Sequence, residues 1–414
     1  MLSPLAAQQP APGACFLLTA DHLFDGTRLT EGQSVLVIGD RIEAVGPVED
    51  LDLPAGCAVR DFPGGTLLPG LIEGHSHLLL HPYNEVGWNE QVLNESYAER
   101  AIRGGVHARR SLEAGYTLLR DLGSEGAGYV DVGLKQAIEK GVIPGPRLLV
   151  AGKAIVATGS YGPRGFHEGV AVPLGAEEAD GHDDLIRVVR DQIGHGADLI
   201  KVYADYRWGP DGEARATFTE EELRTIVEIA ASSGRQTVAH AATAEGMRRA
   251  ALAGVATIEH GDGGTPEVFE LMAERGVALC PTLAAGDAIL QYRGWDKARD
   301  PEPERIVQKR ASFAAALEAG VTIVAGGDVG VFPHGDNVRE LEMMVDYGMP
   351  PLAVLQAVTS GNAEVFGRGD RLGQVRGGFL ADLIVVDGNP LEDIGRLRQV
   401  SFVLLGGRPV PLAD

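Results

Sequence analysis

The spacing of hydrophobic residues divides the chain into stretches of different character. Between residues 14 and 62, apolar side chains alternate or cluster in short runs, such as 15–19 and 34–38, that end at Asp-Gly or Gly-Asp turn signals. Between residues 68 and 366, short apolar segments alternate with longer amphipathic ones. The first pattern is typical of antiparallel strands, and the second predicts repeated βα units.

Eight of the short apolar segments are predicted to be parallel strands. They are residues 70–77, 116–121, 147–151, 199–203, 236–240, 257–260, 278–281 and 322–326. Helix boundary signals lie between them, such as a capping box at Thr219 and Glu222, and a helix that begins at Pro266 and ends before Gly276. This alternation indicates an α/β protein with a closed (β/α)8 TIM barrel, whose reactive groups sit at the carboxyl ends of the strands.

The end of the chain returns to strand-like sequence at residues 381–387 and 400–405. We interpret these segments as pairing with the N-terminal strands in one small β-sandwich, so that the barrel is inserted between its two halves. The predicted domains are a sandwich of residues 1–65 plus 370–414 and a catalytic barrel of residues 66–369.

Composition narrows the classes of partner and compartment. The 414 residues carry a formal charge of −22 without a block of Lys and Arg, which argues against nucleic acid and anionic membranes as partners. No run approaches the roughly eighteen apolar residues needed to cross a bilayer. Residues 1–13 do not form an intact signal peptide, so we expect a cytoplasmic protein, or an exported one whose leader is absent. Cys15, Cys57 and Cys280 are scattered and odd in number, which predicts neither a disulfide framework nor a thiolate zinc site.

Metal-ligand residue types recur at the ends of the predicted strands. His75 and His77 end the first one, and because alternate residues of a strand share a face, both imidazoles point into the barrel mouth. The other four are Lys201, His240, His260 and Asp328, at the ends of strands four, five, six and eight. Strand ends of a barrel lie around one rim, so these side chains are predicted to meet in one pocket.

Each of these residues also has an ordinary structural explanation. Lys201 suits a strand end with its ammonium in solvent, His240 and His260 suit hydrogen-bonded core positions, and Asp328 suits a helix cap. The joint occurrence of ligand types at five strand ends favours a site over these separate explanations.

Taken together, the residues resemble the amidohydrolase superfamily. The resemblance is carried by residues 68–77 (LPGLIEGHSH), the strand-four lysine, the two single histidines, the Asp after 325–327 (AGG) and the closing 378–386 (GFLADLIVV). It implies two divalent metal ions, with zinc expected, and carbon dioxide bound as an N-carboxylate on Lys201. It also implies that His75, His77 and Asp328 bind the more buried metal and His240 and His260 the exposed one, with Lys201 shared. Asp328 is then the catalytic proton carrier for a hydroxide that bridges the metals.

The stretches 75–85 and 88–93 are similar to amidohydrolases described as Xaa-Pro dipeptidases, a group that is similar to carboxypeptidase-like and ochratoxin-hydrolysing enzymes. We therefore expect cleavage of an amide or peptide bond in a small substrate with a free carboxylate, such as a dipeptide or an N-acyl amino acid. Tyr203 is predicted to contact the reacting carbonyl, and Arg207, Tyr161 and His81 are further candidates for substrate binding. The resemblance also suggests a homo-oligomer. Two alternatives stay open: a cyclic amide hydrolase or deaminase on the same fold, and a catalytically silent scaffold.

Overall fold

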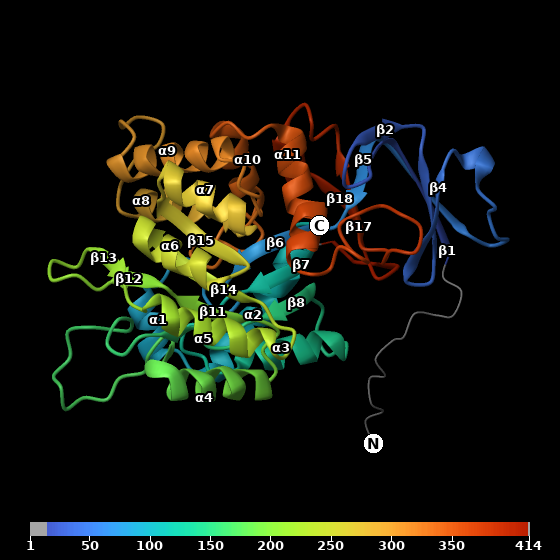
Figure 1. Cartoon of the computed structure of the whole chain (residues 1–414). Coiled ribbons are helices and arrows are strands. Elements are labelled where there is room, and N and C mark those ends of the chain that lie inside the picture. Colours follow the sequence, from blue (N-terminus) through green and yellow to red (C-terminus); the bar gives the residue numbers. More distant parts are fainter. Residues whose placement is uncertain (1–14, 413–414) are drawn as a thin grey trace, which may run out of the picture.

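Strands from both ends of the chain form a single sheet in the computed structural model, which describes residues 15–412 (Figure 1). The expectation that residues 1–13 do not form a signal peptide lies outside the described residues. The strands of this sheet are β1 (Cys15–Phe24), β2 (Leu29–Glu31), β3 (Ser34–Ile38), β4 (Arg41–Gly46), β5 (Ala58–Pro69), β17 (Leu383–Asp387), β18 (Val400–Leu405) and β19 (Arg408–Pro409). Their order is β19-β18-β17-β5-β1-β3-β4, with β2 paired to β1.

This sheet differs in two respects from the expected sandwich of antiparallel strands. Its strands are joined in one continuous sheet, one face of which buries apolar residues such as Leu18, Val37 and Leu383. In addition, β1 and β5 are parallel. The C-terminal strand β17 pairs antiparallel with β5, so both ends of the chain contribute to this sheet. The domain boundaries stay a prediction; β5 itself runs across the predicted boundary at residue 65.

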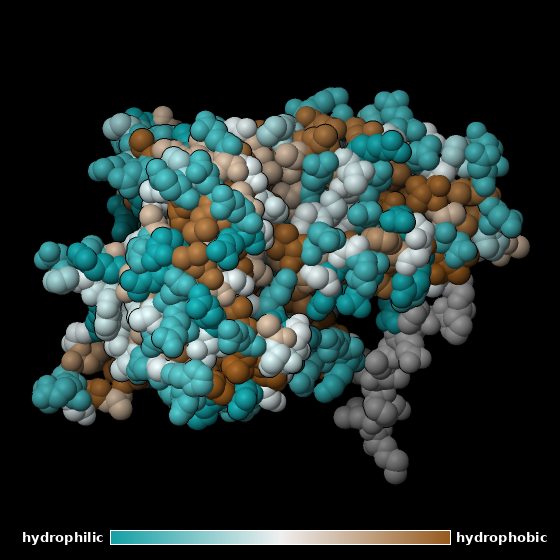
Figure 2. All heavy atoms as spheres, in the orientation of Figure 1, coloured by the Kyte–Doolittle hydropathy of each residue, from teal (hydrophilic) through white to brown (hydrophobic). Residues whose placement is uncertain are grey.

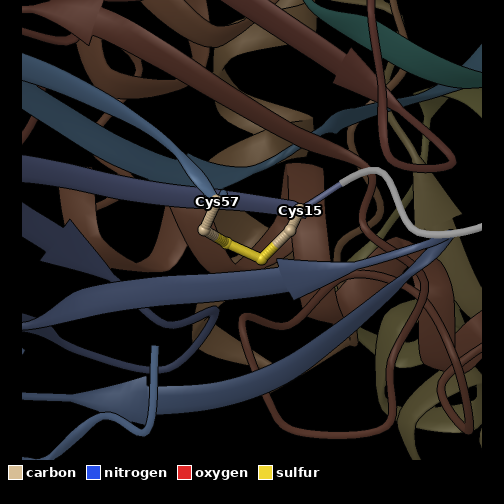
Figure 3. Close-up of a disulfide and its surroundings, with 2 residues drawn as sticks. All are labelled: Cys15 and Cys57. Carbon is tan, nitrogen blue, oxygen red and sulfur yellow. A yellow bond between two sulfur atoms is a disulfide. The ribbon is translucent and has the colours of Figure 1, made fainter. Parts of the chain in front are cut away.

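A disulfide joins Cys15 to Cys57, contrary to the sequence-based expectation (Figure 3). Cys15 begins β1 and Cys57 immediately precedes β5. The parallel register pairs Phe16 with Ala58, and it brings the two cysteine Cα atoms to 4.7 Å. The cysteines are 42 residues apart, and only the strand pairing makes them neighbours. Cys280 remains a buried free thiol.

The middle of the chain contains two parallel sheets. One consists of β6 (Leu71–Ser76), β7 (Tyr116–Asp121) and β8 (Arg147–Val150). The other has the order β10-β9-β11-β14-β15-β16, formed by β10 (Glu177–Glu178), β9 (Ile155–Val156), β11 (Ile200–Tyr203), β14 (Thr237–Thr243), β15 (Thr257–Gly263) and β16 (Ala278–Cys280). Seven of the eight predicted parallel strands are therefore present, each close to its expected bounds.

The eighth predicted strand, residues 322–326, is reduced to an isolated bridge that pairs Ile323 with Leu279, and a second bridge, just beyond the segment, pairs Val329 with Ser76. The segment still lies between β16 and β6, because Leu279 N donates to Thr322 O at 2.9 Å and Gly74 N donates to Ala325 O at 2.9 Å. On the other side, Asp198 N donates to Val150 O at 2.8 Å and links β8 to the segment that enters β11. Backbone hydrogen bonds thus link β16 to β6 through residues 322–326, and link β8 to the segment that enters β11.

Helices follow most of these strands and pack around them (Figure 1). They are α1 (Trp88–Asn94), α2 (Tyr97–Glu113), α3 (Val130–Glu139), α4 (Gly181–Gly194), α5 (Glu220–Ala231), α6 (Ala244–Ala253), α7 (Pro266–Arg275), α8 (Leu283–Tyr292), α9 (Glu304–Glu318), α10 (Val338–Asp346), α11 (Pro351–Gln356) and α12 (Asn362–Val365). The capping box at Thr219 and Glu222 is present, and Gly276 ends α7 in the left-handed conformation, as predicted. On the face of the molecule that Figure 2 shows, hydrophilic residues cover much of the helical surface, as expected for helices that bury one side.

A short hairpin of β12 (Asp205–Arg207) and β13 (Ala214–Ala216) follows β11.

Within residues 15–412, no helix combines the length and the apolar character that a membrane span requires.

Candidate metal centre

Three of the six predicted metal ligands converge on one point. The Nε2 atoms of His75 and His77 lie 3.3 Å apart. Asp328 Oδ1 is 3.3 Å from the Nε2 atom of His77 and 3.6 Å from that of His75. The two imidazoles lie at the end of β6, and Asp328 follows the segment 322–326, which runs beside that strand. His75 and His77 therefore point to the same side of their strand, as predicted, and Asp328 reaches them from the neighbouring segment.

The hydrogen bonds of the two rings determine which nitrogen atoms are free. His75 Nδ1 lies 2.8 Å from the Glu259 carboxylate, and His77 Nδ1 lies 3.0 Å from the Gly123 carbonyl oxygen. Both partners accept hydrogen bonds, so each neutral ring carries its proton on Nδ1 and presents a lone pair at Nε2. Asp328 Oδ1 is buried and has no hydrogen-bond partner. With both rings in their neutral forms, three lone pairs face one another, an arrangement that fits a divalent cation.

Asp328 and His77 shift each other's pKa in opposite directions. Burial raises the pKa of its carboxyl group, but the neighbouring charges of His75 and His77 outweigh burial and hold that pKa at about 2. Burial lowers the pKa of His77, yet the hydrogen bond and charge of Asp328 raise it to about 9. With this pKa, His77 is protonated at neutral pH when no metal is bound, so metal binding would release that proton.

His240 and His260 lie beside this cluster, on β14 and β15. Their ring centroids are 4.4 Å apart, and that of His260 is 5.2 Å from that of His75. Burial, and then the charge of Lys201, lowers the pKa of His240 to about 3. His260 Nδ1 is 2.8 Å from the Thr282 hydroxyl. Burial, and then the charge of His240, lowers the pKa of His260 well below its ordinary value. Both rings are therefore neutral, which is the form that binds metal.

Lys201 is almost completely buried on β11, one strand away from His240. Burial lowers the pKa of its ammonium group, which brings the amine closer to the uncharged form. A solvent-exposed strand-end lysine, the ordinary alternative, is thereby excluded. The carboxylation of Lys201 stays a prediction.

Backbone conformation sets the same region apart. Among the described residues, the non-glycine residues with positive φ are Glu125 (48°), His260 (77°), Thr282 (49°) and Asp328 (62°). All four line one pocket. Such conformations cost energy and persist where surrounding structure holds them, which is most often at functional sites.

That pocket, here called the metal pocket, has a volume of about 360 Å³. The predicted substrate-binding residues Tyr203, Arg207 and Tyr161 line it together with four of the histidines, and Tyr203 stacks on His240 at 4.5 Å between centroids. His81 does not line it. Its ring nitrogens face Glu85 at 3.1 Å and Glu95 at 2.7 Å, so its contact with substrate stays a prediction that these hydrogen bonds do not support.

Sequence reasoning missed several residues that form the pocket or support it. Those that line it include Tyr83, Glu125, Tyr206, Asp262, Arg293, Arg305 and Lys309. Glu125 follows β7 in a loop at the same rim as the ligands, and its place after a predicted strand was the signal available. The others lie on separate elements, among them β12, β15 and α9, and only the packing of these elements brings them to the pocket.

Glu259 contacts His75 on the side of the ring opposite the predicted metal-binding nitrogen. One oxygen faces His75 Nδ1, and the other accepts from Arg120 Nη2 at 2.9 Å and from the Thr257 hydroxyl. Burial raises the pKa of Glu259, but Arg120 and His75 outweigh it and keep that pKa below its ordinary value. A fixed carboxylate of this kind sets the tautomer and orientation of a metal-binding histidine.

Comparison with known proteins places this site in a family. The pattern of the amidohydrolase family matches residues 66–410. The chain belongs to the amidohydrolase family. It is 32% identical to ochratoxinase from Aspergillus niger, across 98% of this chain and 88% of that protein. The amidohydrolase chain is thus a hydrolase that acts on C–N bonds.

Two further relatives are informative. The solved structure of a Xaa-Pro dipeptidase with bound methionine in the active site is 31% identical, with a TM-score of 0.83 over 96% of this amidohydrolase and all of that chain (100%). Imidazolonepropionase from a Geobacillus species is 24% identical, across 87% of this chain and 84% of that protein.

Proposed function

We propose that this amidohydrolase uses two divalent metal ions, expected to be zinc, to cleave the amide bond of a small substrate that has a free carboxylate. The observation that carries the proposal is the meeting of His75 Nε2, His77 Nε2 and Asp328 Oδ1, three buried or half-buried atoms close enough together to bind one metal ion. His240, His260 and a carboxylated Lys201 complete the proposed ligand set.

We also propose that the two parallel sheets belong to one closed (β/α)8 barrel. The hydrogen bonds on either side of residues 322–329, together with the bond from Asp198 to Val150, support closure through the weakly formed eighth strand. Closure explains why residues from β6, β11, β14 and β15 reach a common rim.

The bound metals would lower the pKa of a water molecule and polarise the scissile carbonyl. The chain supplies the proton transfer. Asp328, with its pKa of about 2, is ionised at neutral pH and can accept the proton of the attacking water. The same proton then goes to the nitrogen atom as the C–N bond breaks, so that an amine and a carboxylic acid are released.

Tyr203 is the proposed donor to the oxygen of the tetrahedral intermediate. Its hydroxyl lies 3.4 Å from Glu125 Oε1, a long hydrogen bond that leaves the group at the pocket wall. Burial, and then the charge of Glu125, raises the pKa of Tyr203 well above its ordinary value, so the phenol keeps its proton. A protonated phenol beside the metal pocket suits an oxyanion donor.

The proposed substrate class rests on the pocket and on the relatives. Arg207 lines the pocket and offers a cation for an acidic group of the substrate. Ochratoxinase and the Xaa-Pro dipeptidase with bound methionine support a substrate that releases an amino acid. Cyclic amide hydrolysis is the second candidate, favoured only by the 24% identity to imidazolonepropionase.

A substrate panel with metal analysis tests the proposal. Zinc-supplemented protein is incubated with dipeptides, N-acyl amino acids, ochratoxin A and cyclic ureides, and amino-acid release is measured. We expect release from one of the first three groups, and at least a hundredfold less with Asp328→Asn. Ring opening of ureides without amino-acid release would support the second candidate. Far less than one metal ion per chain, without hydrolysis, would support a silent scaffold.

The disulfide bears on the compartment. Disulfides persist mainly in oxidising environments, so we propose that the Cys15–Cys57 bond favours the exported alternative over the cytoplasmic one. The homo-oligomer also remains a proposal, for which light scattering of the purified chain is the direct test.

A further inference from the structure

A second pocket, here called the outer pocket, adjoins the metal pocket. It has a volume of about 640 Å³. The two pockets share lining residues, among them Tyr161, Tyr206, Arg207 and Arg293. Trp88 and Tyr292 line the outer pocket and not the metal pocket. A substrate with its amide at the metal ligands therefore has continuous space for a further group.

Aromatic rings form much of the outer pocket wall. Tyr161 lies 5.1 Å from Trp88 and 4.8 Å from Tyr206 between ring centroids, edge to face in both pairs. Tyr83 and Tyr292 line the same pocket. Aromatic side chains offer flat apolar surface at a low cost in conformational entropy, and they bind other planar rings by stacking or edge contacts.

Glu125 holds this aromatic wall in place. Its Oε2 atom accepts from Trp88 Nε1 at 2.8 Å and from the Tyr161 hydroxyl at 2.7 Å, while Oε1 accepts from Tyr203 at 3.4 Å. The carboxylate is buried and its residue has a left-handed backbone. The rings are therefore oriented before a ligand arrives, which lowers the entropy lost on binding.

The charge of the outer pocket is opposite to that of the chain. Arg164, Arg207 and Arg293 line it and no Asp or Glu does, although the whole chain has a formal charge of −22. Among the described residues, the guanidinium groups of Arg207 and Arg293 have no carboxylate within ion-pair distance, and both residues are exposed. Unpaired arginines beside aromatic rings are suited to an anion on a planar group.

We propose that the outer pocket binds a planar aromatic group that carries a negative charge, at the end of the substrate distant from the scissile bond. The inference deepens the proposed function and rests on it for the identity of the reaction. Aromatic rings contact the faces of the group, and Arg207 and Arg293 bind its carboxylate or phenolate. Amides of aromatic acids or of aromatic amino acids with a second acidic group form the substrate class.

Calorimetric titration of the full chain with three probes tests the inference. The probes are 2-naphthoate, its neutral analogue 2-naphthamide, and cyclohexanecarboxylate, which keeps the charge without the aromatic plane. We expect 2-naphthoate to bind at least about tenfold more tightly than either analogue, since a charge-assisted hydrogen bond and a stacked ring each contribute about that factor. The titrations are made on zinc-loaded protein and on protein stripped by a chelator, so that binding of the carboxylate to metal is separated from binding in the outer pocket.

Variants assign the binding to the pocket. Arg207→Gln with Arg293→Gln weakens 2-naphthoate by at least about tenfold and leaves 2-naphthamide little changed, whereas Tyr292→Leu weakens both. Arg299→Gln is the matched control, because the Arg299 side chain is 85% exposed and lines neither pocket, and its affinities equal those of the wild type. Circular dichroism of each variant verifies folding.

The outcomes separate the two proposals. Equal affinities for 2-naphthoate and 2-naphthamide in stripped protein, or no effect of the paired arginine substitutions, would overturn the outer pocket inference even if amides are hydrolysed. The expected binding pattern in a protein that hydrolyses no amide would retain the anionic aromatic site and reject the proposed reaction.

Discussion

Replacement of Glu259 by glutamine tests whether the carboxylate behind His75 controls the metal centre. The wild-type carboxylate accepts on both sides: from His75 Nδ1 at 2.8 Å and from Arg120 Nη2 at 2.9 Å. A glutamine amide has one acceptor and one donor, so one of these two contacts becomes donor against donor. If the NH2 group faces His75, the proton of that ring moves to Nε2 and the ligand lone pair is lost. If it faces Arg120, His75 keeps its tautomer but loses a charged acceptor.

The expected loss of metal affinity is tenfold to a hundredfold. Removal of an outer partner of a metal-binding histidine typically has an effect of about that size, which corresponds to about 1.4 to 2.7 kcal/mol of binding free energy. The contact is fully buried, with exposed fractions of 1% for His75 and 0% for Glu259, so solvent screening does not reduce it. The Kd for zinc is measured by competition with a chromogenic chelator, and the free energy of unfolding by urea titration.

Thr257→Val is the matched control. Its hydroxyl donates to the same carboxylate and accepts from Arg120 Nη1 at 3.0 Å, so the substitution removes these two contacts and leaves the one with His75 intact. We expect its zinc Kd to stay within threefold of the wild type. The reasoning would be refuted if Glu259→Gln, shown to be folded, also bound zinc within threefold of the wild type, since the orientation of His75 would then not depend on Glu259.

Three further predictions concern catalysis, folding and pH. Asp328→Asn lowers kcat/KM by about 10² to 10⁴, because the amide cannot carry the proton to the leaving nitrogen; equal activity at matched zinc content would contradict that role. Cys15→Ser with Cys57→Ser lowers the free energy of unfolding by about 4 kcal/mol, the chain entropy of the 42-residue separation, and equal urea midpoints of oxidised and substituted protein would exclude a formed disulfide. Burial lowers the pKa of His107 from 6.5 to about 4, so the folded state binds fewer protons than the unfolded state between these values. Stability is therefore complete above pH 6.5 and lost as pH falls toward 4, by about 3 kcal/mol for this group, and the loss measured by urea titration is smaller in His107→Gln.

The sequence by itself determined the local features of this protein. Short apolar segments located seven parallel strands, because a strand that is buried on both faces leaves a continuous apolar run. The two-residue spacing of His75 and His77 fixed their shared face, and the capping residues around α5 and α7 fixed helix ends, since each depends on atoms within one turn or one strand.

Only the tertiary structure decided which distant groups meet. The pairing of β1 with β5 placed Cys15 beside Cys57, and loop packing placed His81 against Glu95 and away from the pocket. The hydrogen bonds that Trp88 and Tyr161 donate to Glu125 join three separate segments, and Glu125 itself has a left-handed backbone. Contacts of this kind depend on how several distant elements pack together. The sequence pattern within one segment therefore does not predict them.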